Sequence, residues 1–109
     1  MNHRLEVLAE LATAIAAKRS AAPELSYTAK LLSEGVEKCA KKLGEEAVEA
    51  ALAAVSGSKP NLAAEAADVL YHLLVLLAAA EVPLADVMAE LERRKGLSGI
   101  AEKSARKQV

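Results

Sequence analysis

Two short acidic signatures stand out in this sequence, and each places two carboxylates three residues apart. The first pair is Glu46 and Glu49, and the second is Glu65 and Asp68. Residues at positions i and i+3 of a helix share one face, so the members of each pair would point the same way. Like charges at this spacing destabilise a helix by about 0.2–0.5 kcal/mol per pair, which calls for a neutralising partner. Oxygen ligands suit Mg²⁺ or Mn²⁺, so the pattern predicts a divalent-metal site.

A solvated acidic face is the alternative reading of the same residues. Three lysines nearby could pair with the first acidic pair and with the adjacent Glu45, and they are Lys38, Lys41 and Lys42. The second pair argues against that reading, because the helix around Glu65 and Asp68 has almost no other charge before Glu81. The two signatures together therefore favour the metal site.

Composition restricts the fold and the function. The chain has 109 residues, enough for one domain, and Ala and Leu dominate, with two Tyr and no Phe or Trp, which favours an all-α fold. A net charge of −1 gives no sign of a surface for nucleic acid or membrane. The single cysteine, Cys39, excludes an internal disulfide, suits a reducing cytoplasm and is expected to be a small buried apolar residue.

Apolar periodicity and helix-breaking residues divide the chain into helices. The most apolar run, 69–80, is about twelve residues long, which is too short to cross a bilayer. Ser26 is a plausible N-cap, and 33–35 should interrupt the helix that it begins. The predicted helices are 3–18, a stretch from Tyr27, 36–55, 61–80 and 84 to about 95, followed by a polar tail over 96–109.

The two acidic helices are expected to form an antiparallel hairpin, because only the turn at 56–60 joins them. With a rise of about 1.5 Å per residue, both acidic pairs lie at similar distances from that turn and can face each other. The helix 61–80 is apolar most of the way round, which suits the centre of a bundle larger than one chain makes.

Four segments of the sequence closely resemble the phosphoribosyl-ATP pyrophosphohydrolase family. They are 26–32 (SYTAKLL), 35–49 with the first acidic pair, 65–74 with the second, and the tail 98–106. This family of histidine biosynthesis belongs to the all-α nucleoside-triphosphate pyrophosphohydrolase superfamily, which also contains the MazG-type enzymes. The acidic pairs are shared across the superfamily, whereas the 26–32 run and the tail look specific to the histidine branch.

The resemblance implies a fold and a reaction. The expected fold is one domain over 1–109, a helical hairpin of four-helix-bundle type completed by homodimerisation, in the stand-alone form without a cyclohydrolase domain. The implied reaction is hydrolysis of phosphoribosyl-ATP to phosphoribosyl-AMP and pyrophosphate, the second step of L-histidine biosynthesis. The implied partner is therefore a small nucleotide, with no nucleic acid and no membrane.

The resemblance also implies roles for particular residues. Mg²⁺, or Mn²⁺, would be bound by Glu46, Glu49, Glu65 and Asp68. From its position beside Glu46 and Glu49, outside the i,i+3 pairs, Glu45 is a candidate for a metal-linked or base role; the alternative is that it only pairs with Lys41 or Lys42. The expected substrate contacts are Tyr27, Lys30, Lys38, Lys41, Lys42, Lys103 and Arg106.

Two other functions fit parts of the sequence. A MazG-type housecleaning enzyme acting on nucleoside triphosphates would share the metal site but would not need the 26–32 run or the 98–106 tail. A non-enzymatic helical interaction module would leave the facing acids unexplained.

Overall fold

The computed structural model describes residues 2–97 and 99, and most of these residues are helical. No strand occurs among these residues, which confirms the all-α fold. The α-helices are α1 (Glu6–Ala17), α2 (Tyr27–Glu34), α3 (Val36–Ser56), α4 (Lys59–Ala79) and α5 (Leu84–Arg94). Short 3-10 turns occupy Asn2–Leu5, Lys18–Ser20 and Pro23–Leu25. The predicted polar tail lies almost wholly outside the described residues.

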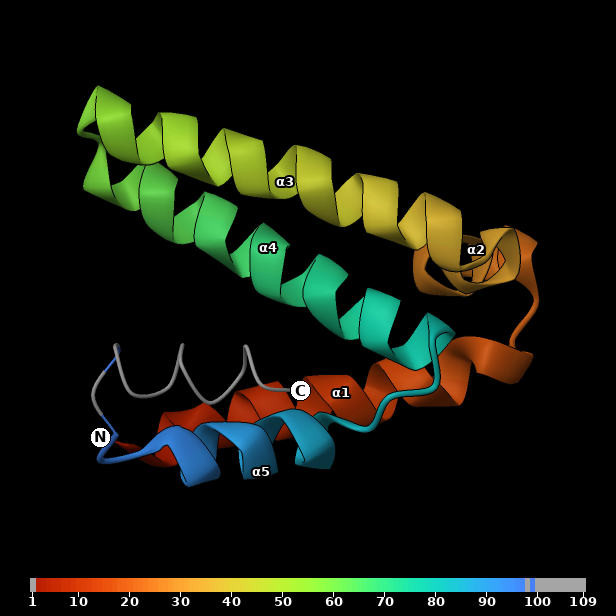
Figure 1. Ribbon diagram of the computed structural model, residues 1–109. Helices are drawn as coiled ribbons and strands as arrows, with labels where there is room; N and C mark the ends of the chain where they lie inside the picture. The colour runs from red at the N-terminus through yellow and green to blue at the C-terminus, as the bar shows by residue number, and fades with distance from the viewer. Residues whose placement is uncertain (1, 98, 100–109) are drawn as a thin grey trace.

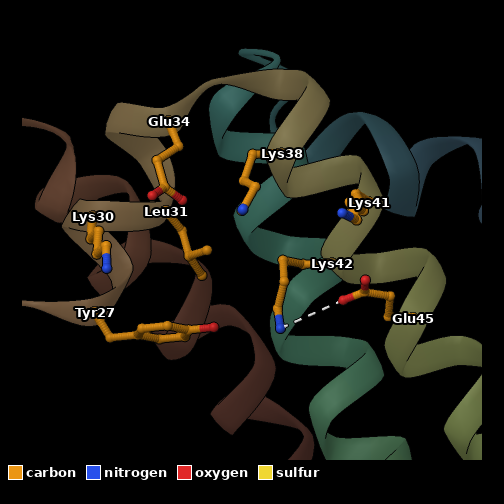
Figure 2. A pocket seen from close by; sticks show the side chains of 8 residues that line it. All are labelled: Tyr27, Lys30, Leu31, Glu34, Lys38, Lys41, Lys42 and Glu45. Carbon is orange, nitrogen blue, oxygen red and sulfur yellow. Dashed lines mark ion pairs between the residues drawn. The ribbon is translucent and has the colours of Figure 1, made fainter.

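Local signals in the sequence set the ends of α2. The Ser26 hydroxyl accepts a hydrogen bond from the backbone N–H of Ala29 at 3.1 Å, which confirms the predicted N-cap. Gly35 ends the helix with a φ of +94°, a conformation that favours glycine. The chain turns there, and α2 packs beside the first turns of α3, where side chains from both helices line a pocket (Figure 2).

The two longest helices, α3 and α4, form an antiparallel hairpin and pack against each other more extensively than any other pair of described elements (Figure 1). The connection is tighter than predicted, because only Gly57 and Ser58 lie between the helices. Gly57 adopts the left-handed conformation with a φ of +86°, and the Ser58 hydroxyl accepts a hydrogen bond from the Asn61 N–H at 3.3 Å. Pro60 lies in the first turn of α4, as predicted.

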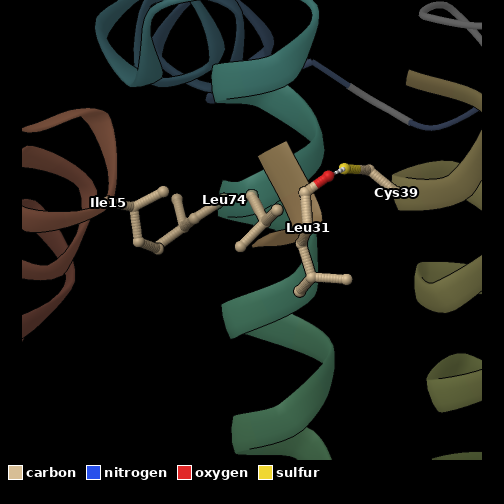
Figure 3. Packing of buried hydrophobic residues seen from close by; sticks show 5 residues of the cluster. Ile15, Leu31, Cys39 and Leu74 are labelled. Carbon is tan, nitrogen blue, oxygen red and sulfur yellow. Dashed lines mark hydrogen bonds between the residues drawn. The ribbon is translucent and has the colours of Figure 1, made fainter. Parts of the chain in front are cut away.

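The hydrophobic core lies where α1 and α2 pack on the hairpin (Figure 3). Val75 of α4 is fully buried, and Cys39 of α3 is 1% exposed. The Cys39 thiol donates a hydrogen bond to the carbonyl of Leu31 at 3.3 Å. Burial raises the pKa of this thiol, and the charge of Glu34 raises it further. Cys39 is therefore the buried apolar residue that the sequence predicted.

Much of the apolar surface of the hairpin is not covered within one chain. Val55 near the end of α3 is 86% exposed, and Leu52 and Val48 on the same helix are also exposed. Leu70 of α4 is exposed as well and lines an apolar pocket with Leu5 and Val7. One chain thus leaves apolar side chains on both helices in contact with solvent.

Among the residues that the structure describes, α4 is the one helix long and apolar enough, by length and composition, to cross a membrane. The expectation that the apolar stretch is too short to cross a bilayer was wrong, because it was based on 69–80 alone. The alanines before Val69 lengthen the apolar stretch. A single helix of this kind does not by itself indicate a membrane span, since core helices of soluble proteins can have the same length and composition. Here α4 packs against α1, α2 and α3.

Candidate active site

Three of the predicted metal-binding acids meet across the hairpin. Glu46 and Glu49 extend from α3 and Glu65 from α4, and one carboxylate oxygen of each lies within 4.8 Å of the other two. The short connection at Gly57 and Ser58 produces this register, because both acidic segments then lie at matching levels of the antiparallel pair. We call these three residues the acid cluster.

Glu65 is the member of the acid cluster with a buried oxygen, Oε1, that lacks a hydrogen-bond partner within the described structure. Burial raises the pKa of the Glu65 carboxyl, and the nearby charges of Glu49, Asp68 and Glu46 raise it further. A buried carboxylate oxygen that faces other carboxylates needs a cation or a proton.

Asp68 lies beside the acid cluster but does not join it. Its side chain is exposed and supplies no oxygen to the group that meets within 4.8 Å, although its charge contributes to the raised pKa of Glu65. The aspartate side chain is one methylene shorter than that of glutamate, so the oxygen stays closer to α4. Asp68 remains a predicted fourth ligand.

The donor atoms of the acid cluster suit a hard divalent cation. All are carboxylate oxygens, the ligand type preferred by Mg²⁺ and Mn²⁺, and no imidazole or thiolate belongs to the group among the described residues. The buried Oε1 of Glu65, which lacks a hydrogen-bond donor, is an atom that such a cation would satisfy. The residues present therefore fit the predicted metal.

A second feature adjoins the acid cluster on the side of α2. A cavity of about 260 Å³ opens at the junction of α2 and α3 and contains six of the predicted site residues (Figure 2). We call it the lysine pocket, and it is lined by Tyr27, Lys30, Leu31, Glu34, Lys38, Lys41, Lys42 and Glu45.

The lysines of this pocket do not neutralise the acid cluster. Among the described residues, Lys42 pairs with Glu45 at 3.7 Å, and no other lysine of the pocket forms an ion pair. Glu45 itself lies outside the acid cluster. In the alternative interpretation, nearby lysines neutralise the acidic pairs. Within the part of the chain that the structure describes, the one ion pair of this kind is the 3.7 Å contact between Lys42 and Glu45, which does not involve the acid cluster.

A cluster of three aromatic rings, from Tyr27, Tyr71 and His72, borders the lysine pocket. The sequence did not predict that these rings lie together. Tyr71 and Thr28 share a short hydrogen bond between their hydroxyl groups. The His72 ring is 6% exposed and contacts Tyr71 edge-on, with centroids 4.9 Å apart, and its Nδ1 has no hydrogen-bond partner within the described structure. Tyr27 lies against both rings and reaches the pocket. Nothing in sequence spacing links Thr28 to Tyr71, since they are far apart in the chain.

Two predicted substrate contacts, Lys103 and Arg106, lie outside the described residues. The pocket includes two residues that the sequence prediction did not name, Leu31 and Glu34. Their helical spacing from Tyr27 and Lys30, four residues in each case, is the signal that places them on the same face of α2.

Comparison with known proteins decides the family. Residues 8–95 match the profile described as phosphoribosyl-ATP pyrophosphohydrolase. The chain belongs to the phosphoribosyl-ATP pyrophosphohydrolase family. The matched region contains all of α1 to α5 except the first two residues of α1, and with them the acid cluster and the lysine pocket.

Several relatives within this family are highly similar over almost their whole length. A phosphoribosyl-ATP pyrophosphatase of Dinoroseobacter shibae is 62% identical over 102 residues, covering 94% of this chain and 100% of its own. One of Cereibacter sphaeroides is 63% identical, with 94% and 99% covered. One of Methylobacterium radiotolerans is 66% identical over 100 residues, with 92% and 94% covered.

Proposed function

We propose that this protein is a phosphoribosyl-ATP pyrophosphatase, which hydrolyses phosphoribosyl-ATP to phosphoribosyl-AMP and pyrophosphate in the second step of L-histidine biosynthesis. The names of its relatives and its family membership support this function. The structural observation that carries the proposal is the acid cluster of Glu46, Glu49 and Glu65. It lies next to a pocket with four lysines, three of which form no ion pair with any residue that the structure describes.

Glu46, Glu49 and Glu65 would hold Mg²⁺, or Mn²⁺, with Asp68 as a further ligand. When bound, the metal supplies charge neutralisation at the phosphates and favours ionisation of the attacking water. The position of the three carboxylates within 4.8 Å of one another supports this assignment, as does the buried Oε1 of Glu65. The two long helices fix the backbone positions from which these side chains extend.

The reaction replaces one oxygen at the α-phosphorus. The water oxygen forms a bond to that phosphorus, the bond to the oxygen that bridges to the β-phosphorus breaks, and its electron pair leaves with pyrophosphate. We assign Glu45 as the acceptor of the water proton, because it adjoins Glu46 in sequence without belonging to the acid cluster. Lys42, at 3.7 Å, would orient this carboxylate.

The remaining substrate contacts would come from cations and one aromatic ring. Lys30, Lys38, Lys41 and Lys42 offer ammonium groups to phosphate oxygens, and Tyr27 borders the same pocket. Lys103 and Arg106 of the tail are proposed to contribute further charge.

We also propose a homodimer and a cytoplasmic location. Exposed Val55, Leu52 and Leu70 leave apolar surface on the hairpin that a second copy would cover. A reduced, buried Cys39 suits the cytoplasm. A monomer by light scattering at micromolar concentration would contradict the dimer.

Substrate comparison tests the proposed function. Pyrophosphate release would be followed with Mg²⁺ and equal concentrations of phosphoribosyl-ATP, ATP and the four dNTPs. The proposal expects turnover of phosphoribosyl-ATP and little of the others. Hydrolysis of dNTPs without hydrolysis of phosphoribosyl-ATP would instead assign a MazG-type housecleaning role.

A further inference from the structure

We propose that the lysine pocket binds the leaving diphosphate, the β- and γ-phosphates of the substrate, and not the phosphate of its phosphoribosyl group. This assignment rests on the proposed function, and it gives the pocket a distinct task beside the acid cluster.

The pocket and the acid cluster share one face of α3. Lys42 precedes Glu46 by four residues and Glu49 by seven, and both separations return a side chain to the same side of a helix. With a rise of 1.5 Å per residue, Lys42 lies about 6 Å along the axis from Glu46. The two features are therefore neighbours, separated by about one helical turn.

Positive charge lies on only one side of the acid cluster along α3. The segment 50–58, which runs from Glu49 to the end of the hairpin, contains no cationic residue. Toward α2, by contrast, Lys38, Lys41 and Lys42 lie within about three turns of Glu49. A triphosphate with its α-phosphate at the acid cluster would extend its remaining phosphates toward these lysines.

The ammonium groups of the pocket are available for a ligand. Lys30, Lys38 and Lys41 form no ion pair with any described residue, and Lys42 has only its 3.7 Å contact with Glu45. Four lysines against Glu34 and Glu45 leave a net charge of about +2 in a cavity of about 260 Å³. Figure 2 shows Lys38 and Lys42 extending from α3 toward the α2 side, with the Tyr27 hydroxyl directed at α3. A multiply charged anion complements this lining.

The other phosphate of the substrate fits this position less well. In phosphoribosyl-ATP the phosphoribosyl phosphate is separated from the triphosphate by two ribose rings and the purine. The β- and γ-phosphates, by contrast, follow the α-phosphate directly. A pocket one helical turn from the acid cluster matches the adjacent groups. There the lysines would also stabilise the negative charge that the bridging oxygen acquires as its bond breaks.

Calorimetric titration of the intact protein with inorganic pyrophosphate and with ribose 5-phosphate tests the assignment. Both are measured in metal-free buffer containing a chelator, so that binding does not depend on the acid cluster. Lys38→Gln and Lys42→Gln should each weaken pyrophosphate binding about tenfold, the effect of one lost charge-assisted hydrogen bond, and leave ribose 5-phosphate unchanged. Lys59→Gln, at the far end of the hairpin, is the matched control and should change neither.

Kinetics provide a second readout. If the lysines stabilise the leaving group, Lys38→Gln, which leaves the pairing of Lys42 with Glu45 intact, should lower kcat for phosphoribosyl-ATP more than it raises KM, and Lys38→Arg should restore part of kcat. Unchanged melting temperatures would show that the variants remain folded, and the arginine variant covers the case in which a glutamine variant does not.

The outcomes separate this inference from the proposed function. Hydrolysis of phosphoribosyl-ATP together with unchanged pyrophosphate binding in both glutamine variants would overturn the pocket assignment alone. Loss of ribose 5-phosphate binding in place of pyrophosphate binding would overturn it in favour of the phosphoribosyl phosphate. Failure of the unmodified protein to hydrolyse phosphoribosyl-ATP would overturn the proposed function, and with it the leaving-group role.

Discussion

Glu49 of α3 and Glu65 of α4 face each other across the hairpin, with one carboxylate oxygen of each within 4.8 Å of the other. Burial is the largest cause of the raised pKa of Glu65, and the charge of Glu49, held nearby by this arrangement, raises it further. Without a cation, the folded protein pays for this arrangement in stability. A site of this kind trades stability for function.

Replacing Glu65 with glutamine should stabilise the metal-free protein. The folded pKa of Glu65 lies above its ordinary value, so its ionisation disfavours the folded state progressively as pH rises from the ordinary pKa through the folded one. Above the folded pKa the full penalty is present, and glutamine removes it. Thermal unfolding at pH 7 with a chelator should therefore show a higher Tm for Glu65→Gln, and the gap should shrink as pH falls toward 4. Added Mg²⁺ should raise Tm in the unmodified protein and much less in the variant. A lower Tm for the variant in chelator would contradict the unfavourable charge at Glu65.

The opposite pH dependence is expected at Glu90 on α5. Arg93 donates two hydrogen bonds to its carboxylate and Arg94 donates one, and these contacts lower its pKa to about 2. The stability that this group contributes is complete above its ordinary pKa of 4.5 and is lost as pH falls toward 2. The effect should be small because the pair is exposed to solvent. Comparing Tm from pH 6 to pH 2 should show a smaller loss for Glu90→Gln than for the unmodified protein, and an equal loss would contradict the pairing.

Truncation of a core residue should destabilise the whole domain. Leu74 is 4% exposed and lies in the core cluster with Ile15 and Leu31. Leu74→Ala is expected to reduce the free energy of unfolding by about 2–5 kcal/mol, through lost burial and the cavity left behind. Urea denaturation would measure the change. Leu25→Ala is the matched control, because that side chain is 84% exposed and should change stability by less than about 0.5 kcal/mol. Equal effects of the two variants would contradict the position of the core.

The sequence was informative where a single residue determines the local structure. Ser26, Gly35 and Pro60 act at the positions predicted for them, because capping, positive φ and the fixed φ of proline are local properties. The prediction that Glu46 and Glu49 face Glu65 followed from the short turn and the rise per residue of a helix.

Other features depended on contacts between distant segments. Asp68 shares its helix face with Glu65, but spacing alone does not show that its shorter side chain stops outside the acid cluster. The pairing of Glu45 with Lys42, one of three possible lysines, depends on side-chain rotamers. The lysine pocket required the reversal of the chain at Gly35, which brings Tyr27 and Lys30 of α2 to the lysines of α3. The direction of that reversal is a tertiary property.

The most direct test of the acid cluster is the rate of pyrophosphate release from phosphoribosyl-ATP as a function of free Mg²⁺. The unmodified protein, Glu49→Gln and Glu37→Gln would be compared, the last replacing an exposed acid of α3 outside the cluster. We predict saturable dependence on Mg²⁺ in the unmodified protein and in Glu37→Gln. For Glu49→Gln we predict a rate lower by about a hundredfold or more, because a direct metal ligand is lost. Equal rates and equal Mg²⁺ dependence in Glu49→Gln and the unmodified protein would contradict the account.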